Sequence, residues 1–335
     1  MGRGSSTLAN VGIAQDWSGR AVLITGAAGL LGRSVAARLV AAGAEVIGLD
    51  IAWNTPRMAI RPAGVKPVDG DVRDIALLGQ LLGDLHVDSV IHLAAQTLVG
   101  PALSDPTYTF ANNIEGSWSV LEACRLATSI SSVVVASSDK AYGDWAGRPY
   151  HEEMALRARH PYDVSKAATD LLAQSYAATY RLPIAVTRCG NLYGGGDLNW
   201  SRIVPGTIRS VLEGEPPVIR SDGTLVRDYL HVDDGANGVL RLADAVRERA
   251  ELRGEPFNLA GSDRLTVREI VDRILAIMGS GLEPNLLGME LAELPAQRVS
   301  TAKVRRIVGW RSRITLDAGL REAVDWYRTN LAVIT

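Results

Sequence analysis

The stretch RAVLITGAAGLLG (residues 20–32) decides the fold of this 335-residue chain. Its first part, RAVLIT (20–25), is typical of a short buried strand, and the apolar residues of 30–42 follow at helical spacing. Gly26, Gly29 and Gly32 lie between strand and helix. Glycines there permit a tight turn and let backbone N–H groups approach a pyrophosphate at a helix N-terminus. The alternative is an ordinary strand–helix turn, and the neighbouring elements and motifs distinguish the two.

Strands and helices alternate through the first half of the chain. We expect further strands at 44–50, 89–95, 132–137 and 183–191, and helices near 74–83, 112–127 and 162–180. This alternation indicates βαβ units, so the predicted fold class is α/β with a doubly wound parallel sheet. After residue 191 glycine and proline become frequent and the elements look shorter and less regular. This change predicts a second, smaller region packed over the open end of the sheet.

An aspartate at the end of the second strand supports a dinucleotide site. Asp50 lies 18 residues after Gly32 (50 − 32). A carboxylate there binds the ribose hydroxyls and repels a 2′-phosphate, which predicts NAD rather than NADP. Asp71 could receive the adenine amine or could cap the next helix. The residues that flank these positions complete the predicted cofactor site: Leu30, Leu31, Val72, Leu93, Ala94 and Ala95.

Tyr162 and Lys166 (YDVSK, 162–166) lie four residues apart on a predicted helix and so share one face. A lysine cation about 4 Å from a tyrosine supplies roughly the 4 kcal/mol that would bring the phenol from a pKa near 10 to near 7. A positive nicotinamide ring can add to this effect. The pair therefore predicts a tyrosinate that takes a hydroxyl proton while hydride leaves for NAD, and it also contacts the cofactor. A surface tyrosine beside a solvated lysine is the alternative.

Net charge, residue spacing and the length of apolar runs argue against several classes of protein. The net charge of −2 gives no case for a nucleic-acid partner. The two cysteines form no CxxC pattern, which suits a reducing cytoplasm, and the histidines show no ligand spacing, so we predict no metal. No apolar run approaches the roughly 18–20 residues of a membrane span. Residues 1–16 are polar and are expected to form a flexible tail.

Together these motifs resemble the extended short-chain dehydrogenase/reductase family: TGxxGxxG, Asp50, the HLAA turn (92–95), a serine at a strand end and YxxxK. The resemblance implies an NAD-binding Rossmann domain at 17–190, to which 225–260 returns. It implies a sugar-nucleotide domain formed by 191–224 and 261–335. It also implies a homodimer through the helices near 112–127 and 162–180, although their apolar faces could equally pack on the sheet. Members act mostly on nucleotide-diphosphate sugars.

Several stretches resemble the nucleotide-sugar 4,6-dehydratases, and those acting on CDP-glucose most. They are WSGRAVLITG (17–26), HLAAQTLV (92–99), SDK (138–140) and GNLYGGGD (190–197). RDYLHVDD (227–234) instead resembles the broader epimerase/dehydratase family. The resemblance implies oxidation of a hexose at C4, loss of water across C5–C6 and return of hydride to C6.

The chain holds only four lysines, Lys66, Lys140, Lys166 and Lys303, and arginine takes the other basic positions. Arginine stays protonated, whereas a desolvated lysine can lose its proton and act as a base. From the dehydratase motif we expect Asp139 to be the acid at O6, Lys140 the base at C5, and Ser138 a hydrogen-bond donor to O4. The alternatives are a strand-end salt bridge from Asp139 to some other cation with Lys140 solvated, and capping for Ser138.

Arg227 and Arg298 are the candidates for the diphosphate, because a guanidinium binds its oxygens in pairs. Gln96 and Asn191 are expected on the substrate side of the site, and the segment 194–205 could fold over the nucleotide. Two other functions remain open. One is a C4 epimerase that uses the same serine, tyrosine and lysine with Asp139 and Lys140 idle. The other is a non-catalytic NAD-binding sensor or scaffold, against which the intact catalytic set weighs.

Overall fold

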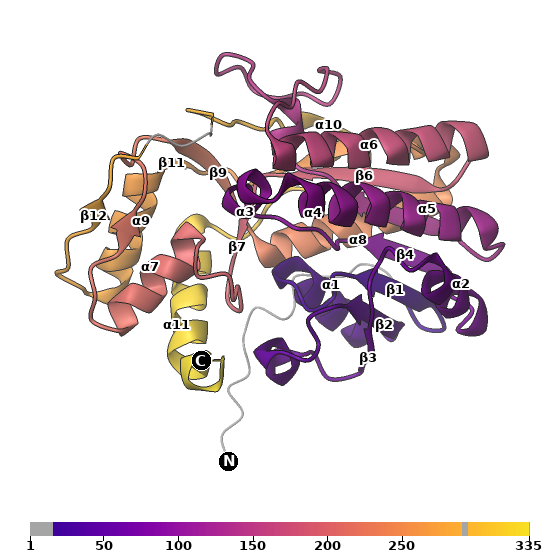
Figure 1. Ribbon diagram of the computed structural model, residues 1–335, viewed down its shortest axis with the longest axis horizontal. Helices are drawn as coiled ribbons and strands as arrows, with labels where there is room; N and C mark the ends of the chain where they lie inside the picture. Colours follow the sequence, from indigo (N-terminus) through magenta and orange to yellow (C-terminus); the bar gives the residue numbers. More distant parts are fainter. Residues whose placement is uncertain (1–15, 290–293, 335) are drawn as a thin grey trace.

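The computed structural model describes residues 16–289 and 294–334, so almost all of the predicted tail lies outside the described residues. Within them, seven strands form one parallel sheet in the order β10-β6-β5-β4-β1-β2-β3 (Figure 1). This confirms the predicted α/β fold with a doubly wound parallel sheet. The strands are β1 (Ala21–Thr25), β2 (Glu45–Asp50), β3 (Val65–Asp69), β4 (Ser89–His92), β5 (Ser132–Ala136), β6 (Ile184–Cys189) and β10 (Pro256–Leu259).

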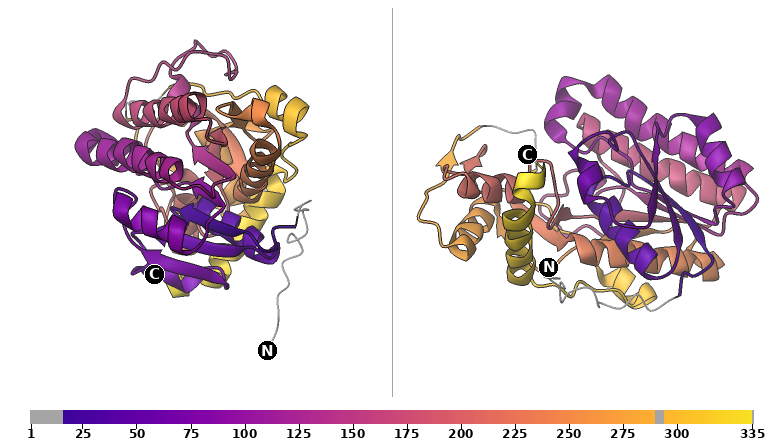
Figure 2. Two further views of the ribbon diagram at one scale, coloured as in Figure 1. Left: turned by 90° about the vertical axis from the view of Figure 1, so that its right-hand side faces the viewer. Right: turned by 90° about the horizontal axis from the view of Figure 1, so that it is seen from below.

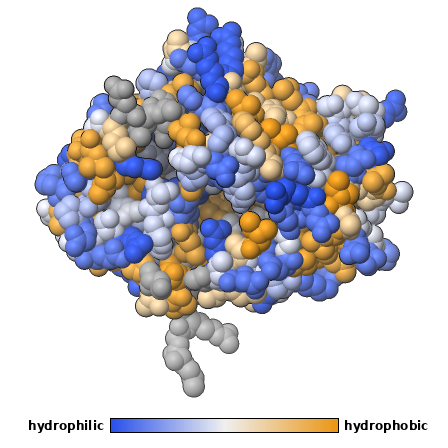
Figure 3. Space-filling view, viewed as in Figure 1, coloured by the Kyte–Doolittle hydropathy of each residue, from blue (hydrophilic) through white to orange (hydrophobic). Residues whose placement is uncertain are grey.

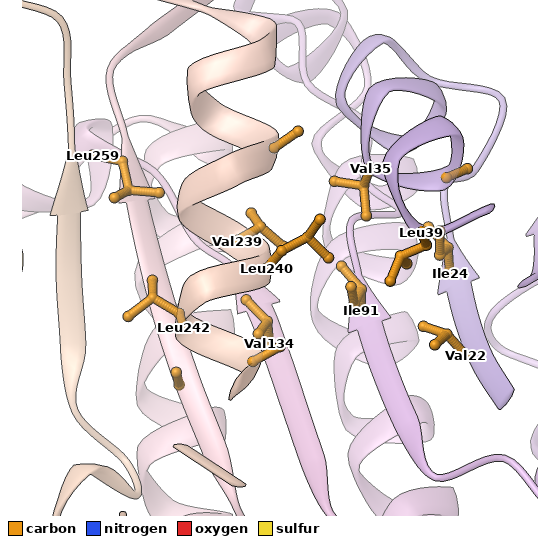
Figure 4. Packing of buried hydrophobic residues seen from close by; sticks show 14 of the residues in the cluster. Val22, Ile24, Val35, Leu39, Ile91, Val134, Val239, Leu240, Leu242 and Leu259 are labelled. Carbon is orange, nitrogen blue, oxygen red and sulfur yellow. The ribbon is translucent and has the colours of Figure 1, made fainter. Parts of the chain in front are cut away.

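Helices cover both faces of this sheet because its strands are apolar on both sides. Val22 and Ile24 of β1 pack with α1 (Leu30–Ala41) and α8 (Val232–Glu248), as Figure 4 shows. Leu23, between them, points to the opposite face, where α2 (Ile75–Asp84), α5 (Gly116–Leu126) and α6 (Pro161–Tyr180) lie. A parallel strand covered on both faces reads as a continuous apolar run, which is why β1, β2, β4, β5 and β6 were predictable; β3 and β10 were not predicted.

Short elements connect the layers. α3 (Val99–Ser104) and α4 (Pro106–Phe110) lead into a π-helical turn, η2 (Ala111–Glu115), and then into α5. The helix expected at 112–127 is therefore not a regular α-helix at its start. The remaining short turns are η1 (Pro56–Ile60), η3 (Asp139–Tyr142) and η4 (Ala250–Leu252).

The smaller part of the molecule lies beyond the carboxyl ends of the strands. Its sheets are β11-β9-β7 and β12-β8, formed by β7 (Asn191–Tyr193), β8 (Val218–Ile219), β9 (Val226–His231), β11 (Arg264–Thr266) and β12 (Asn285–Leu286). Their helical neighbours are α7 (Ile203–Leu212), α9 (Val267–Met278) and α11 (Leu316–Ile334), and α10 (Ala302–Val308) packs beside β10. In the right panel of Figure 2, α11 is yellow and stands beside these orange and red helices.

The chain crosses between the two parts more than once. α8 and β10 both pack on the large sheet, although they follow β9 of the smaller part. The expectation of uniformly shorter elements after residue 191 is wrong, because α8 has 17 residues and α11 has 19. The domain boundaries stay a prediction. None of the described helices is both long enough and apolar enough to cross a membrane.

A buried ion pair fastens α6 to the sheet. Arg188 of β6 donates from Nε and Nη2 to the two carboxylate oxygens of Asp170, at 2.8 and 2.9 Å. Their side chains are 2% and 0% exposed. Arg188 also donates to the Tyr142 hydroxyl and to the Glu152 carbonyl, which ties the segment after β5 to the same helix.

Replacing Asp170 with alanine leaves a buried guanidinium without its counter-charge. We therefore expect Asp170→Ala to lower the free energy of unfolding by about 3–5 kcal/mol, measured by urea denaturation. Asp272→Ala is the matched control, because Asp272 pairs with Arg268 on the exposed surface of α9. Its loss should cost less than about 1 kcal/mol. Equal losses in the two variants would contradict a structural role for the buried pair.

Candidate functional site

A cavity of about 1460 Å³ lies between the carboxyl ends of the strands and the smaller part. Its volume exceeds the roughly 300–1,000 Å³ of a typical small-molecule site, so it has room for a dinucleotide and a second ligand. The residues predicted for cofactor, substrate and catalysis line it, with the exception of Arg298. They are Gly26, Gly29, Leu30, Leu31, Gly32, Asp50, Asp71, Val72, Leu93, Ala94, Ala95, Gln96, Ser138, Asp139, Lys140, Tyr162, Lys166, Asn191 and Arg227.

The glycine loop joins β1 to α1 at the floor of this cavity. Gly26 has φ +71°, and a Cβ on it would lie 2.6 Å from the backbone nitrogen of Ala94. Only glycine fits so close to the end of β4. Gly29 is the N-cap of α1 and brings no side chain to its first N–H groups. An uncapped helix N-terminus that faces a cavity suits a pyrophosphate.

Two of the predicted cofactor residues, Asp50 and Asp71, are acidic side chains that line the cavity with the glycine loop. Asp50 accepts hydrogen bonds from the backbone N–H groups of Ala28, at 2.9 Å, and Ala52, at 2.8 Å, so it also holds the glycine loop. Asp71 pairs with Arg73, and hydrogen bonds from Arg73 hold the pKa of that carboxyl below its usual value. The alternative that Asp71 caps the next helix is wrong, because Asp74 is the N-cap of α2.

Tyr162 and Lys166 are both buried beside the end of β5. The Lys166 amino group donates to the Ala136 carbonyl oxygen at 2.9 Å, and burial lowers its pKa to about 8. Burial raises the pKa of Tyr162 to about 12, while a hydrogen bond with Ser138 acts in the opposite direction. In this arrangement Lys166 donates to the backbone and does not offset the effect of burial on the pKa of Tyr162, so the tyrosinate role of the pair stays a prediction.

The Ser-Asp-Lys stretch forms the start of η3, directly after β5. The Ser138 hydroxyl accepts from the Lys140 backbone N–H at 3.2 Å and donates to Asp139 at 3.1 Å, so it does cap this turn. Asp139 is only 3% exposed, and burial raises its carboxyl pKa although Lys140 and Arg227 act to lower it. A buried carboxyl group of this kind is suited to donate a proton.

Lys140 does not extend into bulk solvent. Its Nζ donates to the side-chain oxygen of Gln297 at 3.1 Å, and the residue lines the cavity. The alternative of a fully solvated lysine is wrong. The catalytic roles of Asp139 and Lys140 stay predictions.

Of the residues predicted on the substrate side, all except Arg298 line the cavity. Asn191 and Arg227 line the cavity from β7 and β9, and Arg227 donates to the carbonyl oxygens of Val226 and Leu294. Gln96 also lines it, but its amide N–H₂ donates to the nearby Leu98 carbonyl and to the Thr109 hydroxyl of α4. The cavity lining does not include Arg298, whose carbonyl accepts from the Tyr150 N–H.

Three long-range contacts at the site, made by Arg33, Gln297 and Arg202, were not predicted, because no local pattern indicates them. Arg33 donates to the carbonyls of Ala28 and Gly196, and Gln297 accepts from Lys140. Arg202 bridges Asp197, at 3.0 Å, and Thr97, at 2.8 Å, and its charge acts to lower the pKa of Tyr162. Arg33 and Arg202 thus hold the segment 194–202 against the cofactor side. In the described ranges, no cluster of three or more His, Cys, Asp or Glu side chains could hold a metal ion.

Curated proteins similar to this chain include sugar-nucleotide enzymes. The chain is 32% identical to dTDP-glucose 4,6-dehydratase of Streptomyces antibioticus, over 93% of each chain. It is 29% identical to an Arabidopsis thaliana trifunctional UDP-glucose 4,6-dehydratase/UDP-4-keto-6-deoxy-D-glucose 3,5-epimerase/UDP-4-keto-L-rhamnose-reductase, over 92% of this chain. The chain spans about half the length of that plant relative, 47%.

Solved structures with the same fold include both dehydratases and epimerases. DesIV, a dTDP-glucose 4,6-dehydratase of Streptomyces venezuelae with NAD bound, superposes with a TM-score of 0.83 at 28% identity, covering 93% of this chain and 98% of that one. The epimerase Mth375 of Methanothermobacter thermautotrophicus gives 0.86 at 25% identity, covering 95% of each chain. The model of the NAD dependent epimerase/dehydratase family matches residues 22–260, which confirms the predicted family and cofactor. With its glycine loop, Asp50 and the Tyr162–Lys166 helix arranged around one cavity, the chain belongs to the NAD-dependent epimerase/dehydratase family.

Proposed function

We propose that the protein is a nucleotide-diphosphate-hexose 4,6-dehydratase. The observation that carries this proposal is the placement of Asp139 and Lys140, which line the same cavity as Ser138, Tyr162 and Lys166. Oxidation at C4 requires only the last three of these residues. The loss of water from C5 and C6 requires an acid and a base in addition, and a buried carboxyl group beside an amine provides them.

The first step concerns the C4 hydroxyl group of the hexose. Tyr162 takes the hydroxyl proton while Ser138 donates a hydrogen bond to O4, and the C4 hydrogen leaves as hydride. The glycine loop and Asp50 would hold NAD, which would supply the hydride acceptor at C4 and the donor at C6, and its positive ring would favour the tyrosinate that Lys166 alone does not produce. The product of this step is a C4 ketone.

The ketone makes the neighbouring C5 proton acidic, because the carbanion is stabilised as an enolate. Lys140, as the neutral amine, removes this proton. Asp139, as the protonated acid, gives its proton to the C6 hydroxyl, which leaves as water. Hydride then adds to C6 and a proton to C5, so that the 4-keto-6-deoxy sugar forms with loss of one water and no net oxidation.

The nucleotide remains a prediction from resemblance. The quoted stretches favour CDP-glucose, whereas the relatives reported above are named for dTDP-glucose and UDP-glucose. A C4 epimerase is the second candidate, since the fold is shared with Mth375. The buried Asp139 and the cavity-lining Lys140 weigh against it, because epimerisation requires neither of them.

The test is incubation of the purified protein with NAD and CDP-, UDP-, dTDP- and GDP-hexoses, followed by mass spectrometry. We expect one donor to give a product lighter by one water. A product of unchanged mass with inverted C4 would establish the epimerase instead. If no donor reacts, both enzymatic proposals fail and a sensor or scaffold is favoured.

Replacing Lys140 separates oxidation from elimination. We expect Lys140→Ala to oxidise C4, seen as NADH absorbance in a single turnover, and to lose water about 10²–10⁴ times more slowly than the parent. Lys66→Ala is the matched control, because Lys66 is exposed and pairs with Glu45 far from the cavity. Dehydration by Lys140→Ala at the parent rate would remove Lys140 from the mechanism.

We further propose that the protein is a homodimer through α5 and α6. These helices lie side by side and carry exposed apolar side chains on the face visible in Figure 3. The exposed residues are Trp118 and Leu126 on α5, Leu171 and Tyr180 on α6, and Leu103 and Tyr108 on α3 and α4. We also expect a reducing cytoplasm, because Cys124 and Cys189 are free and buried.

Negative charges on the exposed face of α5 should separate the subunits. We expect Trp118→Glu with Leu126→Glu to convert a dimer into a monomer in sedimentation velocity, because a carboxylate would have to be buried at the contact. Val333→Glu is the control, since Val333 is equally exposed but lies on α11. A parent protein that sediments as a monomer would refute the dimer.

A further inference from the structure

We propose that Gln297 is a positioning residue that aims the Lys140 amine into the cavity and keeps it able to act as a base. This inference rests on the proposed dehydratase function and extends it to a residue that does not touch the substrate. It concerns the elimination of water and not the oxidation at C4.

Gln297 lies behind Lys140 and not in the cavity wall. The residue is 1% exposed, and its side-chain oxygen accepts the hydrogen bond from Lys140 Nζ at 3.1 Å. Lys140 itself is half-buried and lines the cavity. The flexible lysine side chain is therefore held at its far end, so that less rotamer entropy is lost when it meets the substrate.

The backbone around Gln297 is fixed independently of Lys140. Its N–H donates to the Val226 carbonyl at 3.2 Å, and the neighbouring Ala296 forms a β-bridge with Val226. Two residues on, the Val299 N–H donates to the Asp228 carboxylate at 2.6 Å. Both anchors belong to β9, so the smaller part of the molecule holds the amide against a residue that follows β5 of the large sheet.

A neutral acceptor is the chemically appropriate partner for a lysine that must lose its proton. An amide oxygen accepts a hydrogen bond from an amine or an ammonium, whereas a carboxylate would favour the ammonium form strongly. Among charged groups, Asp139 of η3 interacts electrostatically with Lys140 and with Arg227 of β9, and also with Asp228. Asp228 of β9 is already paired with Arg264 of β11.

The variant Gln297→Glu keeps the size of the side chain and changes only its charge. We expect the pH profile of dehydration to move towards alkaline pH by roughly one unit or more, while C4 oxidation keeps its parent profile. Gln80→Glu makes the same chemical change on the exposed surface of α2 and should leave both profiles unchanged. Gln297→Met removes the acceptor without adding charge, and should slow dehydration about tenfold at every pH without slowing NADH formation.

A second measurement does not depend on activity. With only four lysines in the chain, ¹³C-labelled lysine gives few NMR signals, and Lys140→Arg assigns one of them by its loss. We expect the midpoint of the Lys140 titration to lie higher in Gln297→Glu than in the parent, with the other signals unmoved. This measurement also shows whether each variant is folded.

The two proposals fail in different ways. If the parent dehydrates a donor and Gln297→Glu changes neither the pH profile nor the Lys140 signal, Gln297 does not position Lys140. If the parent dehydrates nothing, the proposed function is wrong, whatever the NMR signal shows. A profile shift that affects C4 oxidation equally would assign Gln297 a general structural role and overturn this inference.

Discussion

Burial of the Asp139 carboxyl group at the end of β5 is the constraint around which the rest of the site is arranged. The strand before it is apolar and fully covered, so the chain leaves the sheet inside the molecule and not at its surface. A buried carboxylate without partners costs several kcal/mol, and the group responds by holding its proton more tightly. Interactions with Ser138, Lys140 and Arg227 act to lower the pKa of Asp139, but by less than burial raises it.

Features set by neighbouring residues were predictable from the sequence. The glycine loop, the aspartate after β2 and the Tyr162–Lys166 spacing are local patterns, and each was found at the cavity. β3 was missed because it is a largely exposed edge strand that contains Pro67. The long helices α8 and α11 were missed although neither contains proline, because the glycine and proline residues that suggested irregular structure lie outside them, between 194 and 217.

Contacts between distant segments could not be predicted in the same way. Lys140 and Gln297 are 157 positions apart, and Arg202 and Thr97 are 105 apart. Nothing in LPAQR (294–298) distinguishes the glutamine, which lies outside the cavity, from its neighbour Arg298. The pKa of Tyr162 depended on how deeply the phenol is buried and on which acceptor Lys166 selects, and a spacing of four residues determines neither.

The same fold occurs in dehydratases and in epimerases. In our proposal only a few residues distinguish the two reactions. In the proposed mechanism, Ser138, Tyr162 and Lys166 carry out the oxidation at C4. In our proposal the dehydratase differs through a single turn after β5, in which one carboxyl group and one amine are added. Such a change requires no rearrangement of the sheet or of the cofactor loop.

Arg33 has a consequence for how the cofactor is exchanged. Its buried guanidinium joins the carbonyl of Ala28, beside the glycine loop, to the carbonyl of Gly196 on the opposite wall. Separating the glycine loop from the segment around Gly196 would leave the buried Arg33 cation without hydrogen-bond acceptors. These two hydrogen bonds therefore oppose the separation. In the proposed reaction the hydride returns in every cycle, so the dinucleotide need not be released, and the Arg33 contacts favour a coenzyme that stays bound over many turnovers.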